Sequence, residues 1–156
     1  MIIPWGTDAP IYHRPIVTIG MMVVNVLVFF LFPSSEYEDW TLVLGEGIHP
    51  LQWMTNNFMH VGLVHLAGNM IFLWTFGLIV EGKLGWWRFL LIYLGLATGE
   101  SAGVQLLVHP ATPIHMLGAS GVVFGLLAMC VVWAPMNEVV CIIWFRFTPR
   151  DRKSVV

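Results

Sequence analysis

The chain has 156 residues, of which 58% are hydrophobic and only 10% are charged. A soluble domain usually carries about 25% charged residues. This composition therefore excludes an ordinary soluble domain and is typical of a protein with several membrane-spanning helices. The formal net charge of -2 offers no basic surface for nucleic acid, and the length suits one domain of a few helices.

The two cysteines, Cys130 and Cys141, both lie in apolar stretches. We expect them to be small buried side chains rather than partners in a disulfide bond. The first residues include Pro4, Asp8 and Pro10 and show neither a basic start nor a small-residue cleavage site. We therefore expect no cleavable signal peptide, and the first apolar stretch to serve as an uncleaved signal anchor.

Four apolar stretches are candidates for membrane spans. The pattern predicts these spans at residues 16–32, 63–80, 86–108 and 117–135. A fifth apolar stretch, 139–147, is too short to cross a bilayer, which takes about 20 residues. The predicted fold is an all-α polytopic transmembrane bundle with four spans.

The spans divide the chain into three parts. Residues 1–15 form an N-terminal arm, residues 16–147 form the membrane domain, and residues 148–156 form a basic tail. The long loop between the first two spans carries acidic residues but no Lys or Arg. We expect this loop to lie at the membrane interface, with Trp40 and Trp53 as interfacial belt residues.

The basic residues support this layout. All seven lie in three places: at Arg14, in the turn that carries Lys83 and Arg88, and near the C-terminus. Four spans put these three places on one side of the membrane, and the positive-inside rule makes that side cytoplasmic. The sequence thus predicts a multi-pass protein of a bacterial inner membrane with both termini in the cytoplasm.

Three polar side chains, His60, His65 and Asn69, lie at the start of the second span. Polar groups in hydrocarbon are costly and usually face the bundle interior or a water-filled cavity. His65 and Asn69 are four residues apart, so they share one helix face. Hydrogen bonding between helices is one interpretation. A metal site is a weaker one, because no carboxylate lies nearby and the two histidines are five residues apart.

The stretch Gly118-Ala119-Ser120-Gly121 opens the last span. A serine between glycines at a helix start can act as a nucleophile whose own N–H points at the reacting oxygen. Taken alone, such small residues are more often helix packing contacts. The predicted topology nevertheless brings Ser120 to the depth of His65 and Asn69, roughly 8 Å below the outer boundary of the hydrocarbon. A nucleophile at this depth needs a water-accessible cavity and a substrate within the membrane.

The order His60-x4-His65-x3-Asn69, followed by the Gly-Ala-Ser-Gly stretch at the head of a later span, resembles the rhomboid family of intramembrane serine proteases. The resemblance covers most of the chain from about Trp53 to Pro135. It implies a helical membrane domain that cleaves transmembrane segments of membrane proteins.

The resemblance also implies roles for individual residues. Ser120 would attack the scissile carbonyl. Asn69 and His65 would stabilise the oxyanion together with the Ser120 backbone N–H, and Gly118 would complete the oxyanion site. Transmembrane protein substrates are the implied partners, and no metal or organic cofactor is implied.

Three further residues would have structural roles by the same resemblance. His60 would brace the outer loop beside the site. Gly121 would let the backbone and the substrate come close. Glu81 would be a structural residue at the cytoplasmic end of its helix.

The chain departs from the family pattern in two places. The family often carries Trp-Arg in the outer loop where this chain has Leu51-Gln52, with Trp53 displaced by two positions. The family's general base is a His in a later span, and no His follows Ser120 here. His109 and His115 precede Ser120 outside the membrane and are poor substitutes. We therefore expect the first four helices of a six-helix protein, with impaired activity.

Two other functions remain open. A rhomboid-like pseudoprotease would bind transmembrane helices without cleaving them, and the missing base favours this alternative. Glu100 and Gln105 in the third span are also compatible with a transport pathway. Their position near the outer end of the span, where water has access, makes the transport interpretation the weaker of the two.

Overall fold

The computed structural model describes residues 2–7, 11–32, 37–133 and 139–143. Most of these residues are helical, as the apolar stretches predict. In chain order the elements are β1 (Ile2–Thr7), α1 (Ile16–Leu31), α2 (Tyr37–Trp40), β2 (Leu42–Leu44), α3 (Pro50–Thr55), the 3-10 turn Asn56–Phe58, α4 (Leu63–Leu84), α5 (Trp86–Leu107), β3 (Ile114–Met116), α6 (Ser120–Trp133) and β4 (Val139–Ile143).

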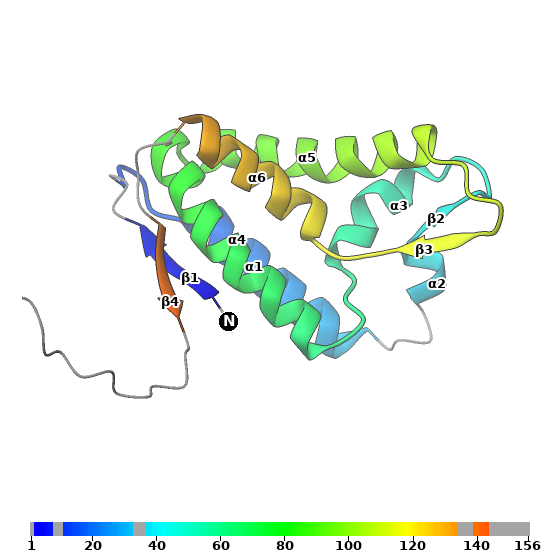
Figure 1. The fold of residues 1–156 in the computed structure, drawn as a ribbon, viewed down its shortest axis with the longest axis horizontal. Helices are drawn as coiled ribbons and strands as arrows, with labels where there is room; N and C mark the ends of the chain where they lie inside the picture. Colours follow the sequence, from blue (N-terminus) through cyan, green and yellow to red (C-terminus); the bar gives the residue numbers. More distant parts are fainter. Residues whose placement is uncertain (1, 8–10, 33–36, 134–138, 144–156) are drawn as a thin grey trace, which may run out of the picture.

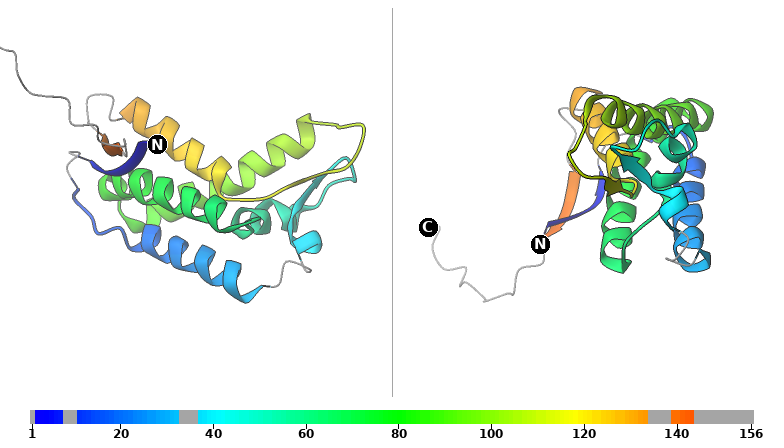
Figure 2. Two further views of the ribbon diagram at one scale, coloured as in Figure 1. Left: turned by 60° about the horizontal axis from the view of Figure 1, so that its bottom comes forward. Right: turned by 90° about the vertical axis from the view of Figure 1, so that its right-hand side faces the viewer.

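Helix α4 lies at the centre of the bundle. It packs against α1, α5 and α6, and α1 runs antiparallel beside it (Figures 1 and 2). The interfaces between these helices are filled by apolar side chains with no exposed surface, which are Leu73, Phe89, Tyr93, Ala97, Val122 and Leu126. Close packing of this kind is what holds helices together in a bilayer, where lipid is as apolar as the side chains.

The four expected spans coincide with α1, α4, α5 and α6. Helices α4 and α5 have 22 residues each and are long and apolar enough to cross a membrane. Helices α1 and α6 have 16 and 14 residues. At 1.5 Å per residue they extend about 24 and 21 Å, less than a hydrocarbon core of about 30 Å. Two of the four expected spans therefore reach full spanning length.

The segments between the helices form a cap at one end of the bundle (Figure 1, right). Strands β2 and β3 pair antiparallel, with Leu42 opposite Met116 and Leu44 opposite Ile114. Helices α2 and α3 pack beside this pair. The cap thus joins the long loop after α1 to the connection that leads into α6.

The two short sheets were not part of the expected all-α fold. Besides the pair in the cap, β1 pairs antiparallel with β4, with Ile2 opposite Ile143 and Thr7 opposite Val139. The N-terminal arm is therefore partly a strand, and the stretch expected at residues 139–147 begins as its partner. The basic tail, 148–156, lies outside the described residues.

Glu81 joins the end of α4 to the start of α1. Its side chain has no exposed surface. Its carboxylate accepts hydrogen bonds from the Val17 N–H at 2.8 Å and from the Thr18 N–H and hydroxyl, both at 2.7 Å. The first amides of a helix have no acceptor within the helix, and a carboxylate there also complements the helix dipole. Glu81 thus caps α1 from another helix, which is a structural role.

Candidate active site

Helix α4 presents His65 and Asn69 toward the start of α6. Gly118, two residues before Ser120, packs directly against both side chains. A Cβ atom built on Gly118 would lie 2.7 Å from Cε1 of His65 and 3.5 Å from Nδ2 of Asn69. The two motifs singled out in the sequence are separated by 49 positions between Asn69 and Gly118, and they therefore meet in space.

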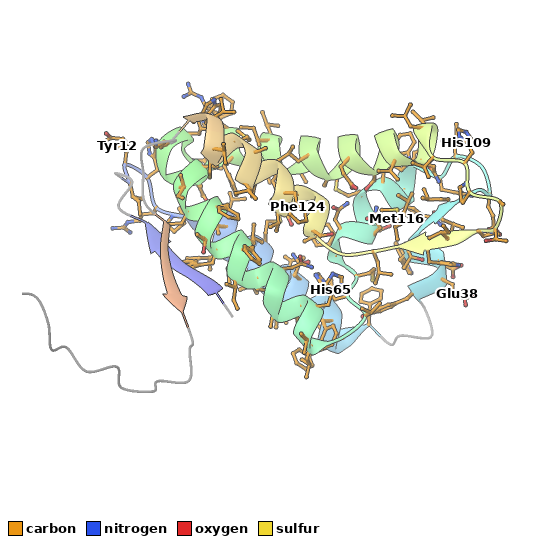
Figure 3. The ribbon with its side chains drawn as sticks, in the orientation of Figure 1. Tyr12, Glu38, His65, His109, Met116 and Phe124 are labelled. Carbon is orange, nitrogen blue, oxygen red and sulfur yellow. The ribbon has the colours of Figure 1, made fainter. Side chains whose placement is uncertain are left out.

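A cavity of about 260 Å³ lies between α4 and α6 at this meeting point. Its polar end is formed by His65, Asn69 and Ser120. Its remaining walls are glycine and apolar side chains, namely Val64, Gly68, Phe72, Phe76, Val123, Phe124 and Leu127. Figure 3 shows His65 on α4 and Phe124 on α6, the two helices that flank the cavity.

Ser120 is the first residue of α6, and its side chain is half-buried. The backbone N–H groups at a helix start have no acceptor within the helix and carry the positive end of the helix dipole. The N–H of Ser120 is therefore suited to hold a negatively charged oxygen beside the hydroxyl of the same residue.

Gly118 has a φ of +114°, a backbone conformation that L side chains rarely adopt. Its N–H donates to the carbonyl oxygen of Asn56 at 2.9 Å. Because this N–H is already engaged, what Gly118 offers beside His65 and Asn69 is its missing side chain, which lets the segment before Ser120 lie against them. The oxyanion role expected for Gly118 stays a prediction.

Gly121 faces α5 rather than the cavity. A Cβ atom built on Gly121 would lie 2.5 Å from the carboxylate carbon of Glu100. The absence of a side chain at this position lets α6 pack directly against Glu100, whose carboxylate also accepts from the Ser101 hydroxyl at 3.3 Å. Gly121 thus brings two helices together.

His60 lies in the loop just before α4 and is 1% exposed. Its Nδ1 is 3.3 Å from the carbonyl oxygen of Phe58, so this ring braces the loop, and its centroid is 5.2 Å from that of His65. Burial lowers the pKa of His60 to about 4, outweighing the hydrogen bond to Phe58, which acts in the opposite direction. His60 is therefore neutral at physiological pH.

Gln105 holds the cap on α5. Its Oε1 accepts from the Trp53 indole N–H at 2.6 Å and from the His49 N–H at 3.2 Å, and its Nε2 donates to the Val43 carbonyl at 2.9 Å. Trp53 thus anchors the outer loop although it stands two positions from the family's usual Trp. These contacts explain why a polar side chain stands at position 105, and no transport pathway is needed to account for it.

Sequence reasoning missed a second set of contacts between the cap and α5. The Nδ2 of Asn56 donates to the Ser101 hydroxyl at 2.9 Å. The Nδ2 of Asn57 donates to the Trp53 carbonyl at 2.9 Å and lies 3.3 Å from the Ala97 carbonyl. The adjacent Asn-Asn pair before an apolar span was the available signal, because both amides need partners when buried.

The other two candidate histidines lie away from Ser120. The His115 side chain is exposed, and its Nδ1 is 3.1 Å from the Thr41 hydroxyl. His109 is also exposed, at the end of α5. Neither lines the cavity with Ser120. Among the residues that the structure describes, no three His, Cys, Asp or Glu side chains gather into a set that could ligate a metal.

Comparisons with known proteins agree with the motifs. The family model for the rhomboid domain matches residues 49–148. Rhomboid protease GluP of Bacillus subtilis is 32% identical over 144 residues, which cover 85% of this chain and 28% of GluP. Putative rhomboid protease YdcA of the same organism is 33% identical over 119 residues, covering 72% of this chain and 59% of YdcA.

A third relative is Rhomboid protease GlpG of Pectobacterium atrosepticum. It is 30% identical over 123 residues, which cover 74% of this chain and 42% of GlpG. The chain thus spans less than two thirds of the length of each of these relatives. The matched region nevertheless contains both halves of the cavity, and the chain belongs to the rhomboid family of intramembrane serine proteases.

Proposed function

We propose that this chain is an intramembrane serine endopeptidase whose nucleophile, Ser120, attacks peptide bonds in transmembrane segments of membrane proteins. The observation that carries this proposal is the cavity whose polar end unites His65, Asn69 and Ser120. Its apolar walls suit a hydrophobic peptide, and its few convergent polar groups are typical of a site that orients one reacting bond. Membership of a protease family supports the same reaction.

In the proposed reaction the Ser120 hydroxyl oxygen adds to the scissile carbonyl carbon and forms a tetrahedral intermediate. The Asn69 Nδ2, which is buried and has no hydrogen-bond partner among the described residues, is free to donate to the oxyanion. The Ser120 N–H and His65 complete this oxyanion site. Collapse of the intermediate breaks the C–N bond, the proton lost by the Ser120 hydroxyl ends on the departing amine, and an acyl-enzyme remains. Water then hydrolyses the ester, which releases the acid half of the substrate and restores the Ser120 hydroxyl.

We expect proteolysis by the 156 residues alone to be weak, because no His follows Ser120 in the sequence. A serine hydroxyl without a base is a poor nucleophile. The alternative is a pseudoprotease that binds transmembrane helices in the α4–α6 cavity without cleaving them. The apolar walls of this cavity, which suit a hydrophobic segment whether or not a bond is cut, are the observation that supports this alternative.

A fluorophosphonate probe distinguishes the two functions, because it reacts only with an activated serine. The chain and its Ser120→Ala variant would be reconstituted in vesicles and treated with the probe and with a helical membrane substrate. Labelling and cleavage that require Ser120 support the peptidase. Substrate binding with no Ser120-dependent labelling supports the pseudoprotease.

We also propose that all four long helices span the bilayer of a bacterial inner membrane, with both termini cytoplasmic. Glu81 joins the end of α4 to the start of α1, which brings Lys83 and Arg14 to the same end of the bundle. Both cations then lie on the side that the positive-inside rule makes cytoplasmic. Reporter fusions after residues 32 and 84 test this topology, because they should report opposite sides of the membrane.

A further inference from the structure

A second hollow, which we call the α1–α4 groove, lies between α1 and α4, two helices that run side by side (Figure 2). Its volume is about 360 Å³, and the side chains that line it are apolar or aromatic. The lining residues are Ile19, Met22, Val23, Val26 and Leu27 of α1 and Trp74 of α4. The groove shares no residue with the cavity between α4 and α6 that holds Ser120.

The α1–α4 groove is about as long as one leaflet is deep. From Ile19 to Leu27, α1 advances by eight residues, or about 12 Å at 1.5 Å per residue. One leaflet contributes about 15 Å of hydrocarbon, which is half of the core of about 30 Å. The groove therefore has the length of a lipid acyl chain in one leaflet, and it is too short to hold a membrane-spanning helix along its whole length.

The N-terminal arm lies at one end of the α1–α4 groove. Gly85 follows Trp74 by eleven residues, about three helical turns, so both lie on one face of α4. A Cβ atom built on Gly85 would lie 3.5 Å from the His13 ring. The N–H groups of Tyr12 and His13 donate to the Gly82 carbonyl at 2.9 and 3.1 Å. The arm thus crosses the end of α4 below Trp74, away from the cap (Figure 3).

Arg14 connects this arm to α1 and lies at the mouth of the groove. It stands two residues before Ile16, where α1 begins, and five before Ile19, where the groove begins. The Arg14 side chain is exposed. The nearby Glu81 carboxylate is buried, and both of its oxygens accept from the first amides of α1. Neither that carboxylate nor those amides are therefore available to a ligand, and the charge at the mouth comes from Arg14.

We propose that the α1–α4 groove binds one anionic phospholipid from the leaflet on the Arg14 side. Its phosphate lies against the Arg14 guanidinium, whose paired N–H donors match phosphate oxygens. The exposed side chains of Tyr12 and His13 offer further donors. One acyl chain lies along Val23 and Trp74. A cationic mouth above an apolar groove is the order of chemistry that a phospholipid requires, and this binding is independent of the proposed peptidase reaction.

Native mass spectrometry of the full chain in detergent tests this proposal. The probes are phosphatidylglycerol and phosphatidylcholine with identical acyl chains, which differ in headgroup charge. We expect the first bound lipid to be phosphatidylglycerol, with a preference of about fivefold or more, because one cationic side chain near an anionic headgroup gives an attraction of this size. Equal affinities for the two lipids would overturn the proposal.

Arg14→Gln should remove this preference. Lys83→Gln is the matched control, because it also removes one positive charge at the same end of the bundle. Lys83 follows Trp74 by nine residues, or two and a half turns, so it lies on the opposite face of α4. The preference should survive in Lys83→Gln. An equal loss in both variants would show a general attraction to the basic end, and it would overturn a defined headgroup site at Arg14.

Val23→Phe tests the acyl chain, because the larger side chain fills the groove without changing any charge. We expect weaker binding of both lipids. Val24→Phe is the matched control, since Val24 is also exposed on α1 but does not line the groove, and it should bind both lipids as before. Unchanged lipid binding in Val23→Phe would contradict an acyl chain in the groove. Loss of a dimer in this variant, visible in the same spectra, would instead assign the groove to a contact between copies.

Thermal unfolding gives a readout that does not depend on proteolysis. A ligand that binds the folded state stabilises it, so phosphatidylglycerol should raise the melting temperature of the chain in detergent. The rise should persist in Ser120→Ala, which removes the proposed nucleophile, and disappear in Arg14→Gln. A rise of the same size in Arg14→Gln would overturn the lipid site and leave the proposed peptidase untouched.

Discussion

The carbonyl oxygen of Asn56 accepts a hydrogen bond from the Gly118 N–H at 2.9 Å, and this contact ties the cap to the segment that carries the nucleophile. Asn56 is itself held by its side chain, which donates to the Ser101 hydroxyl on α5 and to the Gln52 carbonyl. The start of α6 is therefore positioned by a folded loop some 60 residues earlier in the chain.

Gly118→Ala should disrupt this arrangement. The positive φ of Gly118 strains any L side chain, at a cost of order 1–3 kcal/mol, and the new methyl group would meet the His65 ring. We expect a lower thermal stability and a loss of Ser120 labelling. Gly99→Ala is the matched control, because a Cβ atom there meets nothing within 4 Å, and it should be neutral or stabilising. Unchanged labelling in Gly118→Ala would contradict the close packing.

Removing the Glu81 carboxylate should loosen α1 from α4. Glu81→Ala leaves the Val17 and Thr18 amides without their acceptor at a buried helix start. Because buried hydrogen bonds to a charged group contribute about 1.5–3 kcal/mol each, we expect a loss of several kcal/mol in the free energy of unfolding. Glu38→Ala, at an exposed carboxylate, should change it little. Denaturant titration in detergent measures both, and equal effects would refute the capping role.

Gln105→Leu should release the cap while leaving the helices packed. The substitution keeps the side-chain volume but removes the partners of the Trp53 indole, the His49 amide and the Val43 carbonyl. Unsatisfied buried groups cost about 1–3 kcal/mol each, so the cap should open more often. Limited proteolysis should cut within residues 37–62 faster than in Leu106→Ala, a change at the exposed neighbouring position. Equal cleavage rates would show that Gln105 does not hold the cap.

Stability should fall in mild acid because of His60. Its pKa is about 4 in the folded chain and 6.5 in the unfolded chain, so between these values the unfolded state binds more protons. The contribution of His60 to the free energy of unfolding is full above pH 6.5. As the pH falls toward 4, up to about 3 kcal/mol of it is lost. Electrostatic repulsion from the neighbouring His65 also lowers the pKa of His60. The free energy of unfolding, measured from pH 4 to 7.5, should rise with pH. This rise should be smaller in His60→Phe.

The long central helices could be predicted from sequence because their signal is local. Helix α4 begins at the expected Leu63 and continues beyond the expected end at residue 80, up to Leu84, because Glu81 is accommodated by α1 and not by water. The meeting of Asn69 and Ser120 also followed from the sequence, since alternating spans place both at the same end of the bundle.

Contacts between distant segments could not be predicted in this way. Nothing local in the sequence indicates that Gln105 reaches Trp53, or that β1 pairs with β4 across most of the chain. The Gly118 amide could be seen as engaged only once Asn56 was placed beside it. Such contacts depend on which surfaces the packed helices bring together, and a single sequence does not specify those surfaces.

The cap on α1 also has a consequence for biosynthesis. The Thr18 amide finds its acceptor 63 positions later, in the last turn of α4. During translation the first helix is therefore made before that acceptor. Until Glu81 has been made, the amides at this helix end depend on water for a partner, so docking of α1 on α4 follows the synthesis of both helices.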